Sequence, residues 1–488
     1  MSTAPPDDAP TAEGDPASGR APVRPSERLP DAPPLSGAAT VAPSRRTRVV
    51  ENPAYDADDP DDYEDWAWSE HDLLHPIRWW EARGHRWLPG VWYPVALFAL
   101  WRVVHLMVSS YLGGDWQKVP FYYDGERYMQ ITLQGYAQPN VEMPNTAFFP
   151  GVSWISWPIY QWTHSQQWTG QTVATLTALA AFICVWGVSK AWKDEAIARK
   201  AVWLMALFPS SLFLWSYYSE GLFIALGAGA VWADKKNRHW IAALCFAGIC
   251  TTRSVGILVP GIIVLCRIIR QRKLDKWCFV YAGASLIGLA PVLYMINHYT
   301  GSPFSFFNVQ KDWGRGLSWP WVTIRNGFEN LWPTPETIMV PALVSRNFDL
   351  YSIPIIGFAI AWLGFSRDKA PAPVPVPVSV TAGASAAVAP PEADGEAEAT
   401  KPAKGPRAFP MEAWMLGLTL IALPLSSTSL ASFNRFVLAD WVLYPAYATF
   451  AARLPTWWRR AFWLVVVVAL AVTTYHLIGR VSVDRFIG

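Results

Sequence analysis

The stretch Tyr122–Gly151, YYDGERYMQITLQGYAQPNVEMPNTAFFPG, directly follows the first apolar run of membrane length in the chain. Asp124, Glu126 and Arg127 lie together in it, among aromatic residues. A carboxylate at a membrane surface is energetically costly unless it has a function. Asp124 is therefore the leading candidate for a functional residue, and a turn formed with Gly125 is the structural alternative.

The composition is that of a membrane protein. The chain has 488 residues, of which 52% are hydrophobic and 16% charged, and it contains 29 Trp. The charged fraction is below the roughly 25% of soluble domains. The net charge of +2 gives no argument for a nucleic-acid partner. The five cysteines lie in apolar segments or at their edges, with no zinc spacing and no disulfide framework.

The apolar residues are gathered into about eleven runs, each interpreted as a membrane pass. They lie near residues 91–112, 170–190, 200–217, 219–233, 239–252, 254–269, 277–298, 349–366, 410–430, 435–452 and 460–479. The sequence therefore predicts an all-α polytopic membrane protein with about eleven transmembrane helices.

Three segments outside these runs have a distinct composition. Residues 1–71 are rich in Pro, Ala and Asp, which predicts a disordered cytoplasmic tail. Residues 72–90 mix Trp with Arg, as expected of an amphipathic segment lying on the membrane. Residues 367–409 are Pro-rich and then charged, which predicts a disordered cytoplasmic linker.

The remaining chain divides into a membrane catalytic module at 91–366, with outer loops at 113–169 and 299–348, and C-terminal transmembrane helices at 410–488. Lys and Arg are more frequent in the loops placed in the cytoplasm than in the outer loops. This bias is the usual sign of orientation and agrees with a cytoplasmic amino terminus. The Ala/Pro-rich tail and the abundant Trp suggest a bacterial plasma membrane.

Residues 200–234 and 239–266 each lie between basic loops that belong on the same side, so each is predicted to form a hairpin. Each arm has only about 13–18 residues, or roughly 20–27 Å of helix, which is short for a hydrocarbon core of about 30 Å. The hairpin tips carry Glu220 and Arg253. These charges are therefore expected at or just below the outer surface.

Acidic and basic residues are thus expected in one layer at the outer face. They are Asp124, Glu126, Arg127, Glu220, Arg253, Lys311, Asp312, Trp313, Arg315, Asn434 and Arg435. A carboxylate there can act as a general base, and arginines can hold a phosphate and stabilise a leaving group. Neither GxxxxGK[ST] nor GxGxxG is present, so no nucleotide cradle is predicted.

Several motifs resemble those of the PIG-V-type mannosyltransferases, a family of the glycosyltransferase C superfamily. The first-loop motif D-G-x-W-Y-x-x-I-A-x-x-G-Y and the following A-F-F-P resemble YDGERYMQITLQGY and AFFPG. Three later motifs are similar to FPSSLFLWSYYSEGLF, TTRSVG and GSPFSFFNVQKDWGR. The resemblance spans about 91–453, and it departs from the family pattern at Arg127, Thr132 and Ser254, where Trp, Ala and Pro are usual.

The resemblance implies an inverting transfer of a mannosyl, or more generally hexosyl, unit from a polyprenyl-phosphate sugar to an acceptor hydroxyl on the extracytoplasmic side. It implies Asp124 as the general base. The predicted substrate-binding residues are Glu126, Arg127, Tyr128, Glu220, Arg253, Trp313, Arg315 and Arg435. The expected partners are the lipid-linked donor, membrane lipid and a glycan, lipid or protein acceptor.

No metal site or cofactor is predicted, and the neighbouring acids leave a divalent metal an open alternative, although no HxD or DxD spacing occurs beside Asp124. Two other function classes stay open on the sequence. One is a transporter or flippase for a lipid-linked sugar, for which an inverted repeat would be typical. The other is a non-catalytic scaffold of a membrane complex.

Overall fold

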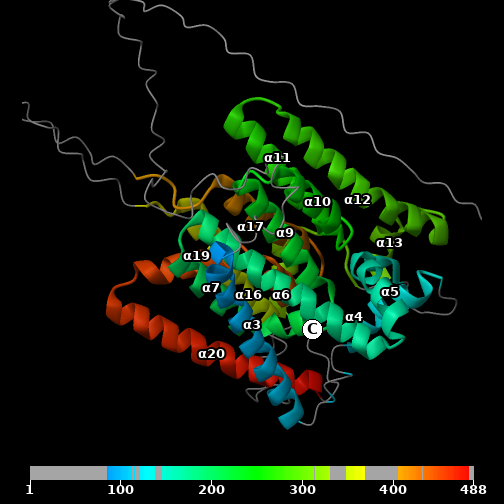
Figure 1. The fold of residues 1–488 in the computed structure, drawn as a ribbon, viewed down its shortest axis with the longest axis horizontal. Coiled ribbons are helices and arrows are strands. Elements are labelled where there is room, and N and C mark those ends of the chain that lie inside the picture. Colours follow the sequence, from blue (N-terminus) through cyan, green and yellow to red (C-terminus); the bar gives the residue numbers. More distant parts are fainter. Residues whose placement is uncertain are drawn as a thin grey trace, which may run out of the picture. The chain divides into compact units, whose positions relative to one another are not determined.

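The computed structural model describes residues 85–112, 115, 118, 121–137, 145–312, 314–329, 348–368, 405–430 and 432–482. The predicted tail 1–71, most of the segment 72–90, most of the linker 367–409 and Trp313 lie outside the described residues. Within these ranges the chain is α-helical, with two isolated β-bridges and no strand (Figure 1).

Most predicted apolar runs coincide with helices of nearly the same bounds. The helices that overlap these runs most are α3 (His85–Tyr111), α6 (Gln166–Trp192), α7 (Glu195–Leu207), α9 (Ser219–Lys235), α10 (His239–Ile249), α11 (Leu258–Gln271), α12 (Lys276–Thr300), α16 (Phe348–Phe365), α17 (Met411–Leu425), α19 (Leu443–Arg453) and α20 (Thr456–Ser482). The other elements are α4 (Asp124–Gln134), η3 (Asn145–Ala147), α5 (Gly151–Thr163), η4 (Pro209–Ser211), α8 (Leu212–Trp215), η5 (Ser254–Ile257), α13 (Ser305–Asp312), α14 (Pro320–Glu329) and α18 (Phe433–Ala439).

Helices that can cross a membrane are present in the described part of the chain. Four are long and apolar enough, beginning at Gly90, Gln166, Ser254 and Lys276, and a bent pair at 195–215 would make a fifth. Helices α10, α16 and α17 are apolar but shorter. These are the helices of an integral membrane protein, whereas the count of eleven passes stays a prediction.

Two runs differ from a single straight pass. The run 200–217 is bent by 76° between α7 and Pro209–Trp215, because Pro209 cannot continue the hydrogen-bond ladder of α7. The run 435–452 is divided into α18 and α19 at Asp440 and Trp441, and both residues are buried. Hydropathy alone does not reveal such breaks, since apolar residues continue on both sides of them.

Local sequence explains where several helices begin. Asp194 accepts a hydrogen bond from the Ile197 amide at 2.7 Å at the start of α7. Asp275 does the same for Cys278 at 3.0 Å at the start of α12. Such N-caps satisfy amide groups that have no partner within the helix.

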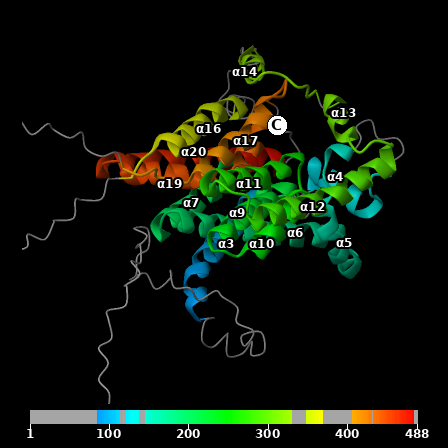
Figure 2. The ribbon, with the colours of Figure 1, turned by 90° about the horizontal axis from the view of Figure 1, so that it is seen from above.

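The interior of the bundle is built by α6, α9, α10 and α12, which pack in succession (Figures 1 and 2). Phe182 of α6, Phe223 of α9 and Phe246 of α10 are almost completely buried there. Helix α9 therefore lies in the middle of the fold. It presents its first turn at one end of the bundle and Lys235 at the other.

The two predicted outer loops contain helices of their own. The first holds α4, η3 and α5, and the second holds α13 and α14. Helix α4 packs on α5, and the Gly151 amide at the start of α5 donates to the Thr251 carbonyl at 2.8 Å. The first loop is thereby joined to the hairpin tip that precedes Arg253.

Candidate active site

Side chains from four separate parts of the chain meet at one end of α9. Asp124 begins α4, Glu220 is in the first turn of α9, Arg253 precedes η5, and Arg435 is in α18. Arg435 Nη1 lies 2.7 Å from Asp124 Oδ2, and its Nη2 lies 2.7 Å from Glu220 Oε1. Arg253 Nη1 lies 3.2 Å from the same Glu220 oxygen. We call these four residues the charge cluster.

Asp124 is fixed by the backbone that precedes it. Tyr123 has a φ of 59°, a left-handed conformation that is unfavourable for a non-glycine residue and is typical of functional sites. The Asp124 amide donates to the Tyr218 hydroxyl at 3.3 Å, and that hydroxyl donates to the Tyr122 carbonyl at 2.9 Å. Asp124 is therefore the first residue of a helix, α4, that is held against Tyr218, the residue directly before α9.

Arg435 is held by aromatic rings as well as by acids. Its guanidinium carbon lies 4.6 Å from the ring centroid of Tyr218 and 4.9 Å from that of Phe213. Its Nε also donates to Glu220 Oε1 at 2.9 Å. A guanidinium can stack on rings and still donate in its plane, which a lysine ammonium cannot reproduce.

The two carboxylates have different surroundings. Glu220 is completely buried, and its Oε2 has no hydrogen-bond partner in the described part of the chain. The Asp124 side chain keeps 19% of its surface exposed, and only its Oδ2 pairs with Arg435. Glu220 is therefore a buried acid that contacts two arginines, and Asp124 is the more accessible of the two carboxylates.

A third arginine joins the charge cluster from the second outer loop. The guanidiniums of Arg253 and Arg315 lie 4.8 and 5.4 Å from the centroid of the Phe436 ring. Burial, followed by the neighbouring charge of Arg435, lowers the pKa of Arg315 to about 10. Arg315 still carries its charge at neutral pH, so three guanidiniums are close to two carboxylates.

The other predicted residues are placed less directly. Tyr128 is buried and donates to Ser219 Oγ at 2.9 Å, next to Glu220 in sequence. Arg127 donates to Asn145 Oδ1 at 3.2 Å within the first outer loop. Glu126 is exposed. Tyr128 thus supports the charge cluster, whereas Arg127 makes its described contact with η3 and Glu126 makes no described contact with the cluster.

Three residues that contribute to the site were not among the predicted site residues. Tyr218 and Phe213 supply the rings on which Arg435 stacks. Asp349 is buried and accepts a hydrogen bond from the Asn434 amide at 2.6 Å, directly beside Arg435. Tyr218 could have been predicted, since it lies two residues before Glu220 in the same hairpin tip. Asp349 could not, because it stands at the edge of an apolar run and belongs to no motif.

Among the described residues, no group of three or more His, Cys, Asp or Glu is arranged to hold a metal ion. The acids of the charge cluster instead pair with arginine. This donor set favours an anionic ligand that the guanidiniums can bind.

Comparisons with known proteins agree with the predicted resemblance. Residues 164–275 match the model of the family described as Mannosyltransferase (PIG-V). A GPI mannosyltransferase 2 from Yarrowia lipolytica is 22% identical over 148 residues, which are 30% of this chain. The match spans 40% of that relative's length.

Two solved structures are similar to this chain at low sequence identity. ArnT from Cupriavidus metallidurans, solved with undecaprenyl phosphate, is 13% identical, with a TM-score of 0.45 over 80% of this chain and 77% of that one. The oligosaccharyltransferase AglB from Archaeoglobus fulgidus, solved with an inhibitory peptide and a dolichol-phosphate, is 10% identical, with a TM-score of 0.42 over 81% and 56% of the two chains.

The family match includes Glu220 and Arg253 and both hairpin tips, while Asp124 and Arg435 lie outside it. The motifs FPSSLFLWSYYSEGLF and TTRSVG fall within the matched residues. The predicted resemblance is thereby confirmed over residues 164–275, which are similar to the PIG-V mannosyltransferase family.

Proposed function

We propose that the protein is an inverting glycosyltransferase that moves a mannosyl or other hexosyl unit from a polyprenyl-phosphate sugar to an acceptor hydroxyl. The charge cluster is the observation that carries this proposal. Together with the neighbouring Arg315, it combines one accessible carboxylate, Asp124, with three guanidiniums. General-base catalysis and phosphate stabilisation require these two kinds of group side by side.

Asp124 is the general base of the proposed reaction. The acceptor hydroxyl oxygen attacks the anomeric carbon on the face opposite the phosphate, and its proton passes to Asp124. Oδ2 is engaged by Arg435, whereas Oδ1 makes no hydrogen bond in the described part of the chain. Oδ1 is therefore the oxygen that we assign to the proton transfer.

The bond between the anomeric carbon and the phosphate oxygen breaks as the new glycosidic bond forms, and its electron pair remains on the phosphate. The phosphate therefore gains negative charge in the transition state. Arg253, Arg315 and Arg435 lie together beside Asp124, so their guanidiniums can donate hydrogen bonds to the phosphate and stabilise this charge. Donors that strengthen their interaction with developing charge lower the barrier.

The buried Glu220 has a supporting part in this scheme. It holds Arg253 and Arg435 through a single oxygen. Without this acid, two arginines would face each other in a site of low polarity, where like charges repel strongly. Glu220 thus keeps the arginines in place before the phosphate arrives.

The proposed topology puts the charge cluster on the extracytoplasmic side of a bacterial plasma membrane, with about eleven passes and a cytoplasmic amino terminus. The bias of Lys and Arg toward the opposite loops supports this orientation. The donor's lipid chain would lie between helices, and its phosphate would reach the cluster at the membrane surface.

The test is to incubate membranes that contain the full chain with radiolabelled polyprenyl-phosphate-mannose. We expect a labelled acceptor that is absent from membranes without the protein. Donor lipid that crosses sealed vesicles without any glycosylated product would instead identify a flippase. Glycosyl transfer with the corresponding glucose donor alone would keep the reaction class and correct the sugar.

A further inference from the structure

A pocket lies at the other end of α9, away from the charge cluster. Glu220 is near the start of this helix and Lys235 ends it, which separates them by about 22 Å at 1.5 Å per residue. The pocket has a volume of about 490 Å³, within the range of small-molecule sites. Nothing in the proposed transfer reaction uses it.

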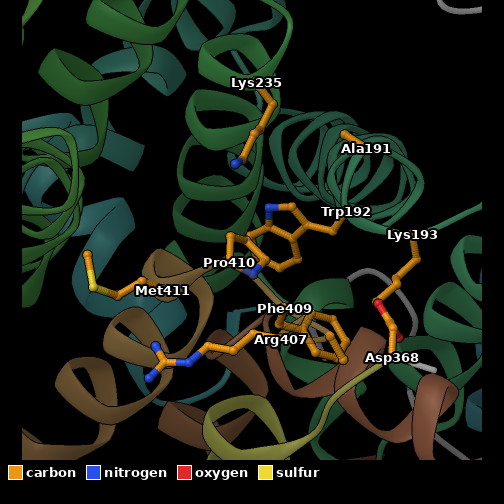
Figure 3. Close-up of a pocket in the computed structure, with 10 residues that line it drawn as sticks. Ala191, Trp192, Lys193, Lys235, Asp368, Arg407, Phe409, Pro410 and Met411 are labelled. Carbon is orange, nitrogen blue, oxygen red and sulfur yellow. The ribbon is translucent and has the colours of Figure 1, made fainter. Parts of the chain in front are cut away.

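Four chain segments line the pocket (Figure 3). Helix α6 contributes Trp192 with the following Lys193, and α9 contributes Lys235. Asp368 follows α16, and 407–411 leads into α17. An antiparallel bridge between Arg367 and Arg407 joins the last two segments. Figure 3 shows the Trp192 indole in the middle of these side chains, between Lys235 and Phe409.

The lining is basic and aromatic. Lys193 pairs with Asp368 at 2.9 Å, and Lys235 pairs with Glu412 at 2.6 Å. For the Arg407 guanidinium, by contrast, the described part of the chain shows no hydrogen bond and no ion pair. Bases therefore exceed acids around the cavity, and one of them is available for a ligand.

A second donor beside the cavity lacks a partner. The indole Nε1 of Trp192 is buried and makes no hydrogen bond among the described residues. A buried N–H without an acceptor is destabilising. An oxygen atom placed between Trp192 and Lys235 would satisfy it.

We propose that this pocket binds a phosphate-bearing anion, and that its source is the headgroup of an anionic phospholipid. Trp192 is the last residue of the membrane-length helix α6, so the pocket lies where headgroups are found. Phe409, Pro410 and Met411 add apolar surface beside the bases. Basic pockets between membrane helices bind anionic headgroups by this combination of charge and apolar contact.

The ligand would add to the ion pairs Lys235–Glu412 and Lys193–Asp368, which already link the segments around the pocket. It would contact the ends of α6 and α9 together with the start of α17. Helix α17 packs on α18, which carries Arg435. Helices α9 and α17 would therefore be stabilised by the ligand at one end of the bundle. The charge cluster depends on the same helices at the other end.

The test measures lipid binding to the purified full chain in neutral detergent by native mass spectrometry. Phosphatidylglycerol is the probe, phosphatidylcholine is the neutral comparison, and glycerol 3-phosphate is the soluble phosphate. The variants are Arg407→Gln and Trp192→Phe, of which the second keeps the ring and removes the N–H. Arg460→Gln is the matched control, since Arg460 is also exposed and does not line the pocket.

We expect phosphatidylglycerol to bind about tenfold more weakly to Arg407→Gln, several-fold more weakly to Trp192→Phe and unchanged to Arg460→Gln, because charge-assisted hydrogen bonds are lost only in the first two. Equal weakening by Arg407→Gln and Arg460→Gln would overturn the pocket in favour of general surface charge. Displacement of the lipid by glycerol 3-phosphate at equal affinity would overturn the lipid source. Binding of phosphatidylcholine as tight as that of phosphatidylglycerol would overturn an anion site.

Discussion

The Arg435 guanidinium contacts the Asp124 carboxylate at 2.7 Å, although 311 positions of sequence separate the two residues. The same guanidinium contacts the buried Glu220. A single side chain therefore connects the reachable acid to the buried acid. Any change in Arg435 is expected to affect both the stability of the site and the placement of Asp124.

The first prediction concerns Asp124 itself. Asp124→Asn keeps the size and the hydrogen bond to Arg435 but cannot accept a proton. We expect the rate of sugar transfer to fall by about 10²–10⁴-fold, the usual contribution of a general base, with donor-lipid binding preserved. Initial rates with labelled donor, together with donor binding to the same preparation, measure this.

Asp115→Asn is the matched control for Asp124→Asn. Asp115 is exposed in the same predicted outer loop and pairs with Lys118 at 3.4 Å, away from the charge cluster. We expect wild-type transfer rates for it, since exposed ion pairs contribute little. Full activity of Asp124→Asn would end the assignment of the base.

The second prediction concerns the burial of Glu220. Arg435→Gln removes two of the guanidinium contacts to Glu220 Oε1 and leaves Arg253 as the remaining ion-pair partner in the described part of the chain. Breaking a buried pair from one side costs about 3–5 kcal/mol. We therefore expect a clear fall in the thermal unfolding temperature of the detergent-solubilised protein.

The double variant Arg435→Gln/Glu220→Gln separates stability from catalysis. It also removes the buried Glu220 charge, which Arg435→Gln leaves with Arg253 alone, so part of the lost stability should return. The rate of sugar transfer should stay low, because the Arg435 guanidinium that we propose binds the phosphate is still absent. If the double variant is no more stable than Arg435→Gln, Glu220 is not the charge that destabilises the single variant.

The third prediction treats Tyr218 as a positioning residue. Tyr218→Phe keeps the ring under Arg435 but loses the hydroxyl that links the Tyr122 carbonyl and the Asp124 amide. We expect kcat to fall by about tenfold, with the KM for the donor nearly unchanged, because a small misplacement of a catalytic group mainly affects the transition state. A rise in KM at constant kcat would instead make Tyr218 a donor-binding residue.

Much of the helical fold could be predicted from hydropathy. The bounds of α6 and α12 agree with the predicted runs 170–190 and 277–298 within a few residues. The bend at Pro209 and the break at Asp440 were not predicted. Both lie inside the predicted runs 200–217 and 435–452, where a single Pro or Asp hardly changes the hydropathy averaged over a run.

The sequence predicted that the charged residues of the site lie at one membrane depth, but it did not predict which of them are in contact. Hairpin length placed Glu220 and Arg253 at the same depth, and they pair at 3.2 Å. The partner of Asp124 could not be inferred, since spacing in sequence carries no information about contacts between α4 and α18. The stacking of Arg435 on Phe213 was missed for the same reason. A ring inside an apolar run gives no sign that it supports a charge.

The last prediction tests the packing that places α9 and its neighbours. A Cβ on Gly288 of α12 would overlap the Ala247 carbonyl of α10, whereas a Cβ on Gly283 of the same helix would meet no atom within 4 Å. Gly288→Ala must therefore separate two closely packed helices, at a cost of about 1–3 kcal/mol. Gly283→Ala should be neutral or stabilise by up to about 1 kcal/mol, because alanine favours helix. Thermal unfolding of both variants in one detergent checks the difference, and equal unfolding temperatures would show that α10 and α12 do not pack through Gly288.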